Sequence, residues 1–176
     1  MVSRSQTITP EGFLAYAESH PETRFDFMDG ELVEVSPKPL HARLQARLTI
    51  RLGNWLDKNP IGHIHTECLH VLNGENFIPD ISINAHLADD EPYFDEPPLL
   101  AIEIRSDTQS RASQRRKAVS YIEHGTPAVL LLFPKEQIEL FTAETGDTPL
   151  VFDIDDVIEN IPGFSGLRLS VKDVIE

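Results

Sequence analysis

The segment from residue 99 to residue 133 constrains the fold of this chain more than any other. It reads as two apolar runs, residues 99–104 and 127–133, separated by one basic helical stretch over residues 111–124. Short apolar runs of this length are typical of buried strands, and Gly125 is well suited to end the helix. Strands that alternate with a helix in this way predict an α/β core.

The other segments can be assigned from local patterns. Thr9 followed by Pro10 predicts a helix from Pro10 to about Ser19, and Asp29-Gly30 predicts a hairpin between strands 24–28 and 32–35. Leucines at intervals of three to four residues predict an amphipathic helix over residues 40–58. Further strands are expected over residues 63–72, 77–83 and 137–142, with an acidic surface loop over residues 86–98.

Length and charge limit the organisation and the partners. The 176 residues suit a single domain spanning 1–176. The formal net charge of −14 disfavours a broad surface for polyanions. A single cysteine, Cys68, excludes an internal disulfide. Because the N-terminus lacks an apolar stretch and no window is long enough to span a membrane, we expect a cytoplasmic protein with no membrane partner.

Glu103 is a carboxylate inside an apolar strand, and such a residue needs a cation, a metal ion or a position at the sheet edge. Arg105 projects from the same face by alternation, so a structural Glu103–Arg105 pair is one interpretation. Asp80, at the start of another strand, suggests a second interpretation of Glu103, as a metal ligand. Two carboxylates from neighbouring strands, with a backbone carbonyl and waters, form an oxygen shell suited to Mg²⁺ or Mn²⁺. A nearby cation would then suit phosphodiester hydrolysis.

Several polar residues leave alternatives open. His41 fits a helix-surface position or a functional one. His63, His65 and His70 would not meet at a metal, because a continuous strand places His70 on the opposite face from the other two. The basic cluster is either a solvated helix face or a phosphate-facing patch; it comprises Arg105, Arg111, Arg115, Arg116 and Lys117.

The ordered motifs resemble a known family. Asp80 and Glu103-Ile104-Arg105 resemble the signature of the PD-(D/E)xK nuclease superfamily, with arginine in the lysine position. From about residue 7 to residue 175 the chain resembles one branch of it, the Uma2 family of restriction endonuclease-like proteins. The matching pieces, in order, are Phe27-Met28-Asp29-Gly30-Glu31-Leu32, Ser36-Pro37 with His41, Pro79-Asp80, Glu103-Ile104-Arg105-Ser106, Lys117 with Tyr121 and Gly125, Pro134, and Ile161-Pro162-Gly163-Phe164.

The resemblance implies a restriction-endonuclease-like fold: a mixed central sheet flanked by helices, with an N-terminal hairpin extension. It also implies a metal-dependent endonuclease acting on nucleic acid, most simply DNA, and working as a homodimer. Mg²⁺ or Mn²⁺ would bind Asp80, Glu103 and the backbone of Ile104, and the lysine role would fall to Arg105 or Lys117. Further contacts to the cavity or to phosphate are expected from Glu31, His41, Arg111, Gln114 and Arg115.

The arginine in the lysine position and the acidic charge leave two other functions open. Arginine keeps its proton at any working pH, so Arg105 would be a poor general base, and water activation would depend on the metal or on Lys117. A catalytically inactive interaction module is therefore the main alternative, which the acidic charge also favours. The other alternative is a metal-dependent hydrolase of small phosphorylated molecules, which also fits the acidic charge.

Overall fold

A six-stranded mixed sheet forms the centre of the computed structural model, which describes residues 8–28, 31–35, 38–106 and 109–176. The strand order is β10-β9-β8-β7-β6-β3. The middle pair, β7 and β8, is parallel and the other neighbours are antiparallel. The strands are β3 (His63–His65), β6 (Ile81–Asn84), β7 (Leu100–Ile104), β8 (Ala128–Phe133), β9 (Gln137–Thr142) and β10 (Leu150–Asp153).

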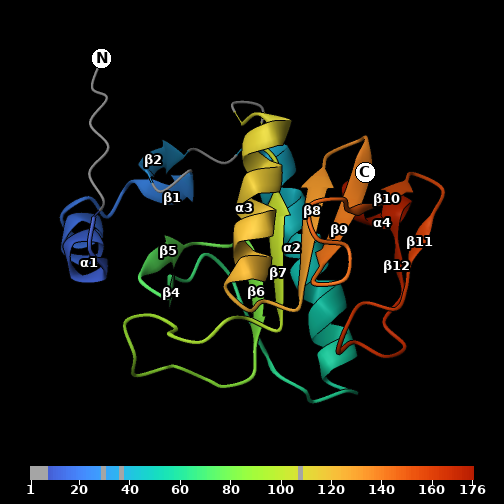
Figure 1. Cartoon of the computed structure of the whole chain (residues 1–176), viewed down its shortest axis with the longest axis horizontal. Helices are drawn as coiled ribbons and strands as arrows, with labels where there is room; N and C mark the ends of the chain where they lie inside the picture. Colours follow the sequence, from blue (N-terminus) through green and yellow to red (C-terminus); the bar gives the residue numbers. More distant parts are fainter. Residues whose placement is uncertain (1–7, 29–30, 36–37, 107–108) are drawn as a thin grey trace.

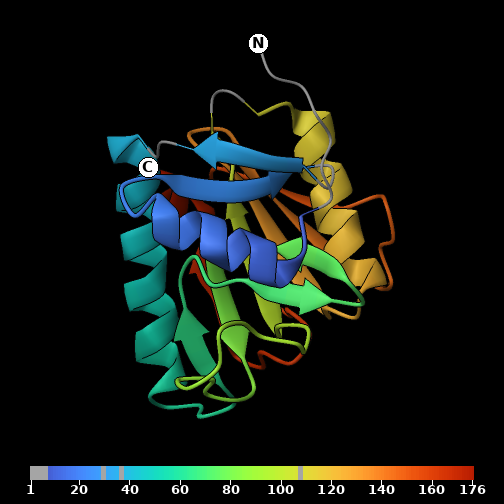
Figure 2. The same cartoon turned by 90° about the vertical axis from the view of Figure 1, so that its left-hand side faces the viewer.

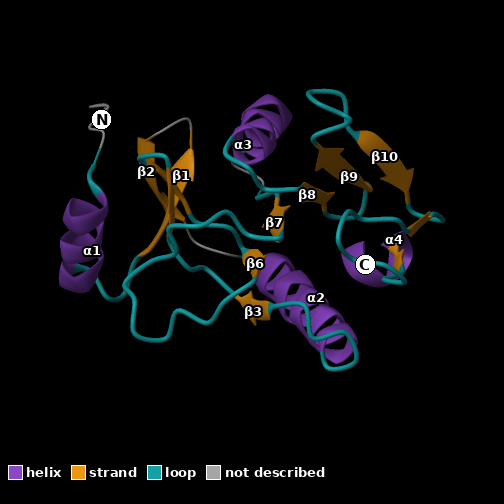
Figure 3. Cartoon of the chain, turned by 60° about the horizontal axis from the view of Figure 1, so that its bottom comes forward, coloured by secondary structure: helices purple, strands orange, loops and turns teal. Residues whose placement is uncertain are grey.

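Helices cover both faces of this sheet (Figure 3). The parallel pair β7 and β8 requires a crossover, and α3 (Arg111–Glu123) supplies it on one face. The helices α2 (Pro39–Leu56) and α4 (Val171–Ile175) lie on the other face. Within the described residues, no helix is both long enough and apolar enough to cross a membrane. The predicted α/β class, with a mixed central sheet between helices, is confirmed.

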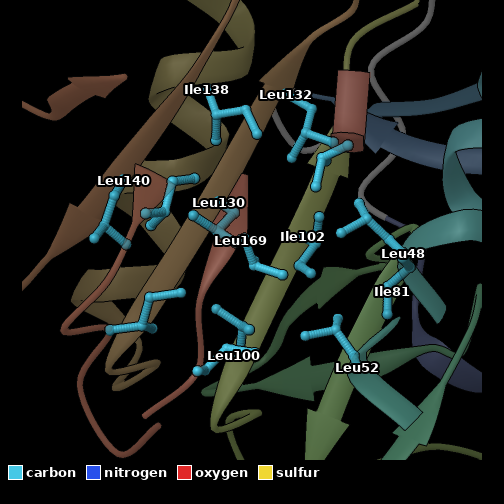
Figure 4. Close-up of a cluster of buried hydrophobic side chains, with 14 of the residues drawn as sticks. Leu48, Leu52, Ile81, Leu100, Ile102, Leu130, Leu132, Ile138, Leu140 and Leu169 are labelled. Carbon is cyan, nitrogen blue, oxygen red and sulfur yellow. The ribbon is translucent and has the colours of Figure 1, made fainter. Parts of the chain in front are cut away.

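The larger hydrophobic core lies between the sheet and α2. The predicted leucine repeat forms the buried face of α2, where Leu44, Leu48 and Leu52 are fully buried. They pack with alternate residues of the strands, so that Leu48 lies near Ile81 and Ile102 (Figure 4). The opposite side chains of the same strands, including Ala101 and Leu131, pack under α3. Each central strand is therefore buried on both faces, as its apolar sequence requires.

An N-terminal extension packs beside the sheet (Figures 1 and 2). It consists of α1 (Pro10–Ser19) and an antiparallel hairpin of β1 (Arg24–Met28) with β2 (Glu31–Val35). The Thr9 hydroxyl accepts a hydrogen bond from the Gly12 N–H and caps α1, as predicted. The predicted turn at Asp29-Gly30 and the motif Ser36-Pro37 lie outside the described residues. A small core of Phe13, Phe27, Leu69 and Ile78 joins the extension to the rest of the protein.

Two predicted strands are each broken in two. Residues 63–72 form β3 and then β4 (His70–Leu72), with Glu67 between them at a φ of 57°. Residues 77–83 are divided into the end of β5 (Glu75–Phe77) and the start of β6, with Pro79-Asp80 between them. Among the described strands, β4 and β5 pair with each other and with none of the six central strands, so the breaks release a separate hairpin from the central sheet. A third short pair, β11 (Val157–Ile158) with β12 (Leu169–Ser170), precedes α4.

The apolar residues Ala112, Ala118, Val119 and Ile122 predict one side of α3 as its buried face, but the face that is buried is more polar. Ala112 is exposed, and Val119 and Ile122 are only partly buried. The residues that face the sheet are Ser113, Gln114, Lys117, Ala118 and Tyr121. An apolar pattern could not reveal this face, because four of its five members carry groups that need polar partners inside the protein.

Candidate functional site

A cavity of about 600 Å³ opens between the N-terminal hairpin, the first turn of α2 and the ends of β6 and β7. Carboxylates from three separate segments, Asp26, Asp80 and Glu103, line it. His41, from α2, lines it too. The structure therefore brings together Asp80, Glu103 and His41, as the sequence predicts, and adds Asp26. The other lining residues are Arg24, Phe25, Glu34, Val35, Lys38, Pro39, Glu67, Ile78, Ile104, Ser106 and Gln109.

Lys117 reaches this cluster from α3. Its ammonium lies 2.6 Å from Asp26 Oδ1 and 2.9 Å from Glu103 Oε1, and its side chain is 6% exposed. It also donates to the Ile78 carbonyl oxygen at 3.4 Å. The Tyr121 hydroxyl, one helical turn further on, donates to Glu103 Oε1 at 2.9 Å. Residues four apart share a helix face, so α3 presents a cation and a hydroxyl together to one carboxylate.

Asp80 is held from a different direction. Its Oδ2 accepts a hydrogen bond of 2.6 Å from the Ile104 N–H, and its Oδ1 lies 3.2 Å from His41 Nε2. Gln45, one turn beyond His41 on α2, donates to the Asp80 carbonyl oxygen at 2.8 Å. The end of β7 and the first two turns of α2 therefore fix the position of Asp80 beside Glu103.

The cluster contains more negative than positive charge. Burial raises the pKa of Glu103; Lys117 opposes this shift, while Asp26 and Asp80 add to it, and the result is a pKa of about 8. Burial likewise raises the pKa of Asp26 despite the attraction of Lys117. Burial would lower the pKa of Lys117, but the charges of Asp26 and Glu103 outweigh it and the pKa rises. Lys117 therefore stays protonated while one carboxyl holds its proton into the neutral range.

His41 is tuned by its contact with Asp80. Burial lowers the pKa of this imidazole. The hydrogen bond to Asp80 and the charge of Asp80 raise it by more than burial lowers it, so the pKa lies above its ordinary value. The other ring nitrogen, Nδ1, is buried and has no hydrogen-bond partner among the described residues. The ring of His41 lines the cavity and contacts Asp80, and is therefore not a solvated residue of the α2 surface.

The Glu103–Arg105 pair considered for this strand is wrong. Arg105 follows the end of β7, and its guanidinium donates to the Gln109 carbonyl oxygen at 3.1 Å and lies 3.5 Å from Glu136. The cation that Glu103 contacts is Lys117, 14 residues later in the chain. The alternation of side chains between the two faces of the sheet does not extend to Arg105, because β7 ends at Ile104.

The expected phosphate-facing patch on α3 is largely neutralised. Arg115 binds the fully buried Glu139 through two hydrogen bonds of 2.6 and 2.8 Å. Arg111 contacts both Glu139 and Glu136 and lies 3.8 Å from the centre of the Phe133 ring. Neither arginine lines the cavity. A buried carboxylate on β9 requires these cations, and they are therefore occupied within the fold.

Two other predicted residues lie away from the cavity lining. Glu31 is an exposed residue of β2, opposite Met28. Gln114 is 1% exposed on α3, and neither polar atom of its amide has a partner among the described residues. The carboxylate that sequence reasoning missed is Asp26. Its signal is the one that identified Glu103: a carboxylate flanked by Phe25 and Phe27 within a strand.

His65 and His70 share one network around Asn84, although a continuous strand would place them on opposite faces, because the strand is broken near Glu67. Asn84 contacts His70 Nε2 at 3.0 Å and His65 Nδ1 at 3.1 Å, and both rings contact Phe94. His70 is fully buried, and burial lowers its pKa. Over the described ranges, no three His, Cys, Asp or Glu side chains form a ready set of metal ligands. The network around Asn84 satisfies buried polar groups.

The raised pKa of Glu103 predicts how stability depends on pH. The folded protein binds the Glu103 proton up to about pH 8, whereas the unfolded chain releases it near 4.5. The free energy of unfolding should therefore fall as the pH rises from about 4.5 to 8. Denaturant unfolding across this range should show a smaller fall for Glu103→Gln, and an unchanged one for Glu123→Gln on the exposed side of α3. Identical pH profiles for wild type and Glu103→Gln would contradict this assignment.

Comparisons with known proteins agree with this architecture. The chain superimposes with a TM-score of 0.80 on the crystal structure of a protein from Anabaena variabilis ATCC 29413, described as a "putative nuclease belonging to DUF820". The match covers 96% of this chain and 97% of that one, at 22% sequence identity. No curated protein sequence matches the chain. The sequence profile of the Uma2 family, described as "Putative restriction endonuclease", matches residues 10–172, and the chain therefore belongs to the Uma2 family.

Proposed function

We propose that this protein is a divalent-metal-dependent endonuclease that hydrolyses phosphodiester bonds of DNA. The observation that carries the proposal is the position of Lys117, whose ammonium contacts Glu103 and Asp26 beside Asp80 at the cavity. We assign the lysine role of the motif to Lys117 rather than to Arg105. The description of the family, "Putative restriction endonuclease", supports the reaction class.

The residues at the cavity fit a hard divalent cation by chemistry and by charge. Asp80 and Glu103 supply carboxylate oxygens, which Mg²⁺ and Mn²⁺ prefer. Burial raises the pKa of Glu103, and the charges of Asp26 and Asp80 raise it further against the opposing charge of Lys117, so the three carboxyl groups outnumber the one ammonium group. We assign the cation to Asp80 and Glu103, with the backbone carbonyl of Ile104. When bound, such an ion lowers the pKa of a coordinated water and neutralises phosphate charge.

The protein's own groups would orient the carboxylates and neutralise negative charge on the phosphate. Because Lys117 keeps its proton, we assign it to stabilising negative charge on the phosphate rather than to abstracting a proton from water. Tyr121 orients Glu103 through its hydroxyl, and His41 together with the Ile104 N–H orients Asp80. These contacts fix the carboxylates before substrate binds, which reduces the reorganisation needed in the transition state.

Cleavage of supercoiled plasmid and of single-stranded DNA in manganese tests the proposal. Asp80→Ala and Glu103→Ala should each lower the rate at least ~100-fold, because each removes an oxygen ligand. The control is Glu123→Ala, which removes an exposed carboxylate from α3 and should leave the rate unchanged. Circular dichroism of each variant verifies that loss of activity does not reflect loss of the fold.

The same assay separates the alternatives. Wild type that neither cleaves DNA nor binds manganese would indicate an inactive interaction module. Turnover of a small chromogenic phosphodiester without cleavage of DNA would indicate a hydrolase of small phosphorylated molecules. Cleavage that survives both substitutions would remove Asp80 and Glu103 from the reaction.

A further inference from the structure

The helix α2 is basic in an otherwise acidic protein. Residues 38–56 hold four of the 15 Lys and Arg residues and none of the 29 Asp and Glu residues. Three of the four, Arg43, Arg47 and Arg51, recur every fourth residue. Residues spaced in this way follow one another along a helix face, about 6 Å apart. The leucines that directly follow them are buried, whereas Arg43 and Arg51 are exposed and Arg47 is partly exposed, so these arginines form a row along one flank of α2, here called the arginine face.

The arginine face is available for an external anion, unlike the arginines of α3. Arg43 is exposed and has no ion pair with any residue that the structure describes. Arg51 is 3.5 Å from Asp173, with the two side chains 43% and 54% exposed, and Arg47 donates to the backbone carbonyl of the same residue. Exposed pairs of this kind are worth about 0–1 kcal/mol. They can therefore exchange for contacts with phosphate.

The arginine face also leads away from the proposed reaction centre. Lys38, Pro39 and His41, at the start of α2, line the cavity, and Arg43 follows one half-turn later. From there α2 runs down one edge of the molecule, away from the β1–β2 hairpin (Figure 2). The first turn of α2 contains no acidic residue, so the helix itself adds no negative charge there.

We propose that the sugar-phosphate backbone of duplex DNA lies along the arginine face when one of its phosphodiester bonds enters the cavity. The inference rests on the proposed endonuclease function and names its substrate-binding surface. B-DNA carries one negative charge per ~1.7 Å of its axis, so a row of cations about 6 Å apart can neutralise successive phosphates. This local surface explains how a chain of net charge −14 holds a polyanion.

Fluorescence anisotropy with a labelled duplex, in EDTA and at 50–200 mM salt, tests this surface. The variant Arg43→Gln/Arg47→Gln/Arg51→Gln should bind at least ~10-fold more weakly at the lower salt, and the slope of log K against log salt should become shallower by up to ~2.7. The control is Arg116→Gln/Lys135→Gln/Arg168→Gln, three exposed cations elsewhere, with the same change in net charge. It should retain the wild-type slope.

The possible outcomes test DNA binding by the arginine face separately from the hydrolytic reaction. Equal losses in the two triple variants, an unchanged slope in the first, or no binding by wild type would each overturn the arginine face. If the arginine face binds DNA as expected while manganese supports no cleavage, the binding surface stands and the hydrolytic proposal falls. If DNA is cleaved with an unchanged KM by the first triple variant, hydrolysis stands and the arginine face falls. Turnover of the small phosphodiester should be the same in all three proteins.

Discussion

Replacing Lys117 with methionine is expected to lower the free energy of unfolding by about 3–5 kcal/mol at pH 8 and to abolish DNA cleavage. The substitution fills a similar volume but leaves Asp26 and Glu103 buried without their cation. The loss of stability should be smaller at pH 5, where both carboxyls can take up protons. Guanidinium unfolding at the two pH values, with cleavage in manganese, measures both effects.

Arg105→Met is the matched control, because it removes the same charge from the other candidate for the lysine role. The side chain of Arg105 is 28% exposed and its partner Glu136 is 49% exposed, so the pair should be worth about 0–1 kcal/mol. Cleavage should survive. The double variant Lys117→Met/Glu103→Gln should recover part of the stability and none of the activity. Loss of cleavage in Arg105→Met with retention in Lys117→Met would reverse the assignment.

Leu48→Ala should lower the free energy of unfolding by about 2–5 kcal/mol. Leu48 is fully buried between α2 and the sheet, beside Ile81 and Ile102 (Figure 4), and its truncation leaves a cavity there. Chemical denaturation measures the loss. Ile50→Ala on the same helix is the control, because Ile50 is 64% exposed and should change stability by less than about 0.5 kcal/mol. Equal effects of the two substitutions would contradict the orientation of α2.

Local sequence patterns predicted most of the fold. The leucine spacing identified α2, and the apolar runs identified β7 and β8, because each pattern repeats with the period of the element that it forms. The break near Glu67 could not be predicted, since a positive φ at a residue other than glycine leaves no signal in composition. The orientation of α3 was missed because Lys117 and Tyr121 are buried by polar contacts rather than by apolar periodicity.

The candidate site, like the fold, could be predicted from the sequence only in part. Asp80 and Glu103 were identified because each is a carboxylate at or within an apolar strand. The choice between Arg105 and Lys117 could not be made, because it depends on where β7 ends and on a contact between Lys117 and Asp26, which are 91 residues apart. The neutralisation of Arg115 by Glu139 is equally non-local, across 24 residues. Pairings of this kind are fixed by tertiary packing, which a single sequence does not reveal.

Calorimetric titration of manganese into the wild-type protein at pH 7.5 tests the central claim most directly: that the carboxylate cluster takes up a divalent cation. We expect saturable binding by wild type, and binding weakened at least ~10-fold in Asp80→Asn and in Glu103→Gln, with Glu123→Gln unchanged. Because both variants are close to the native side chains in size, the fold should be retained. Absence of binding by wild type, or binding unaffected by both substitutions, would contradict the account.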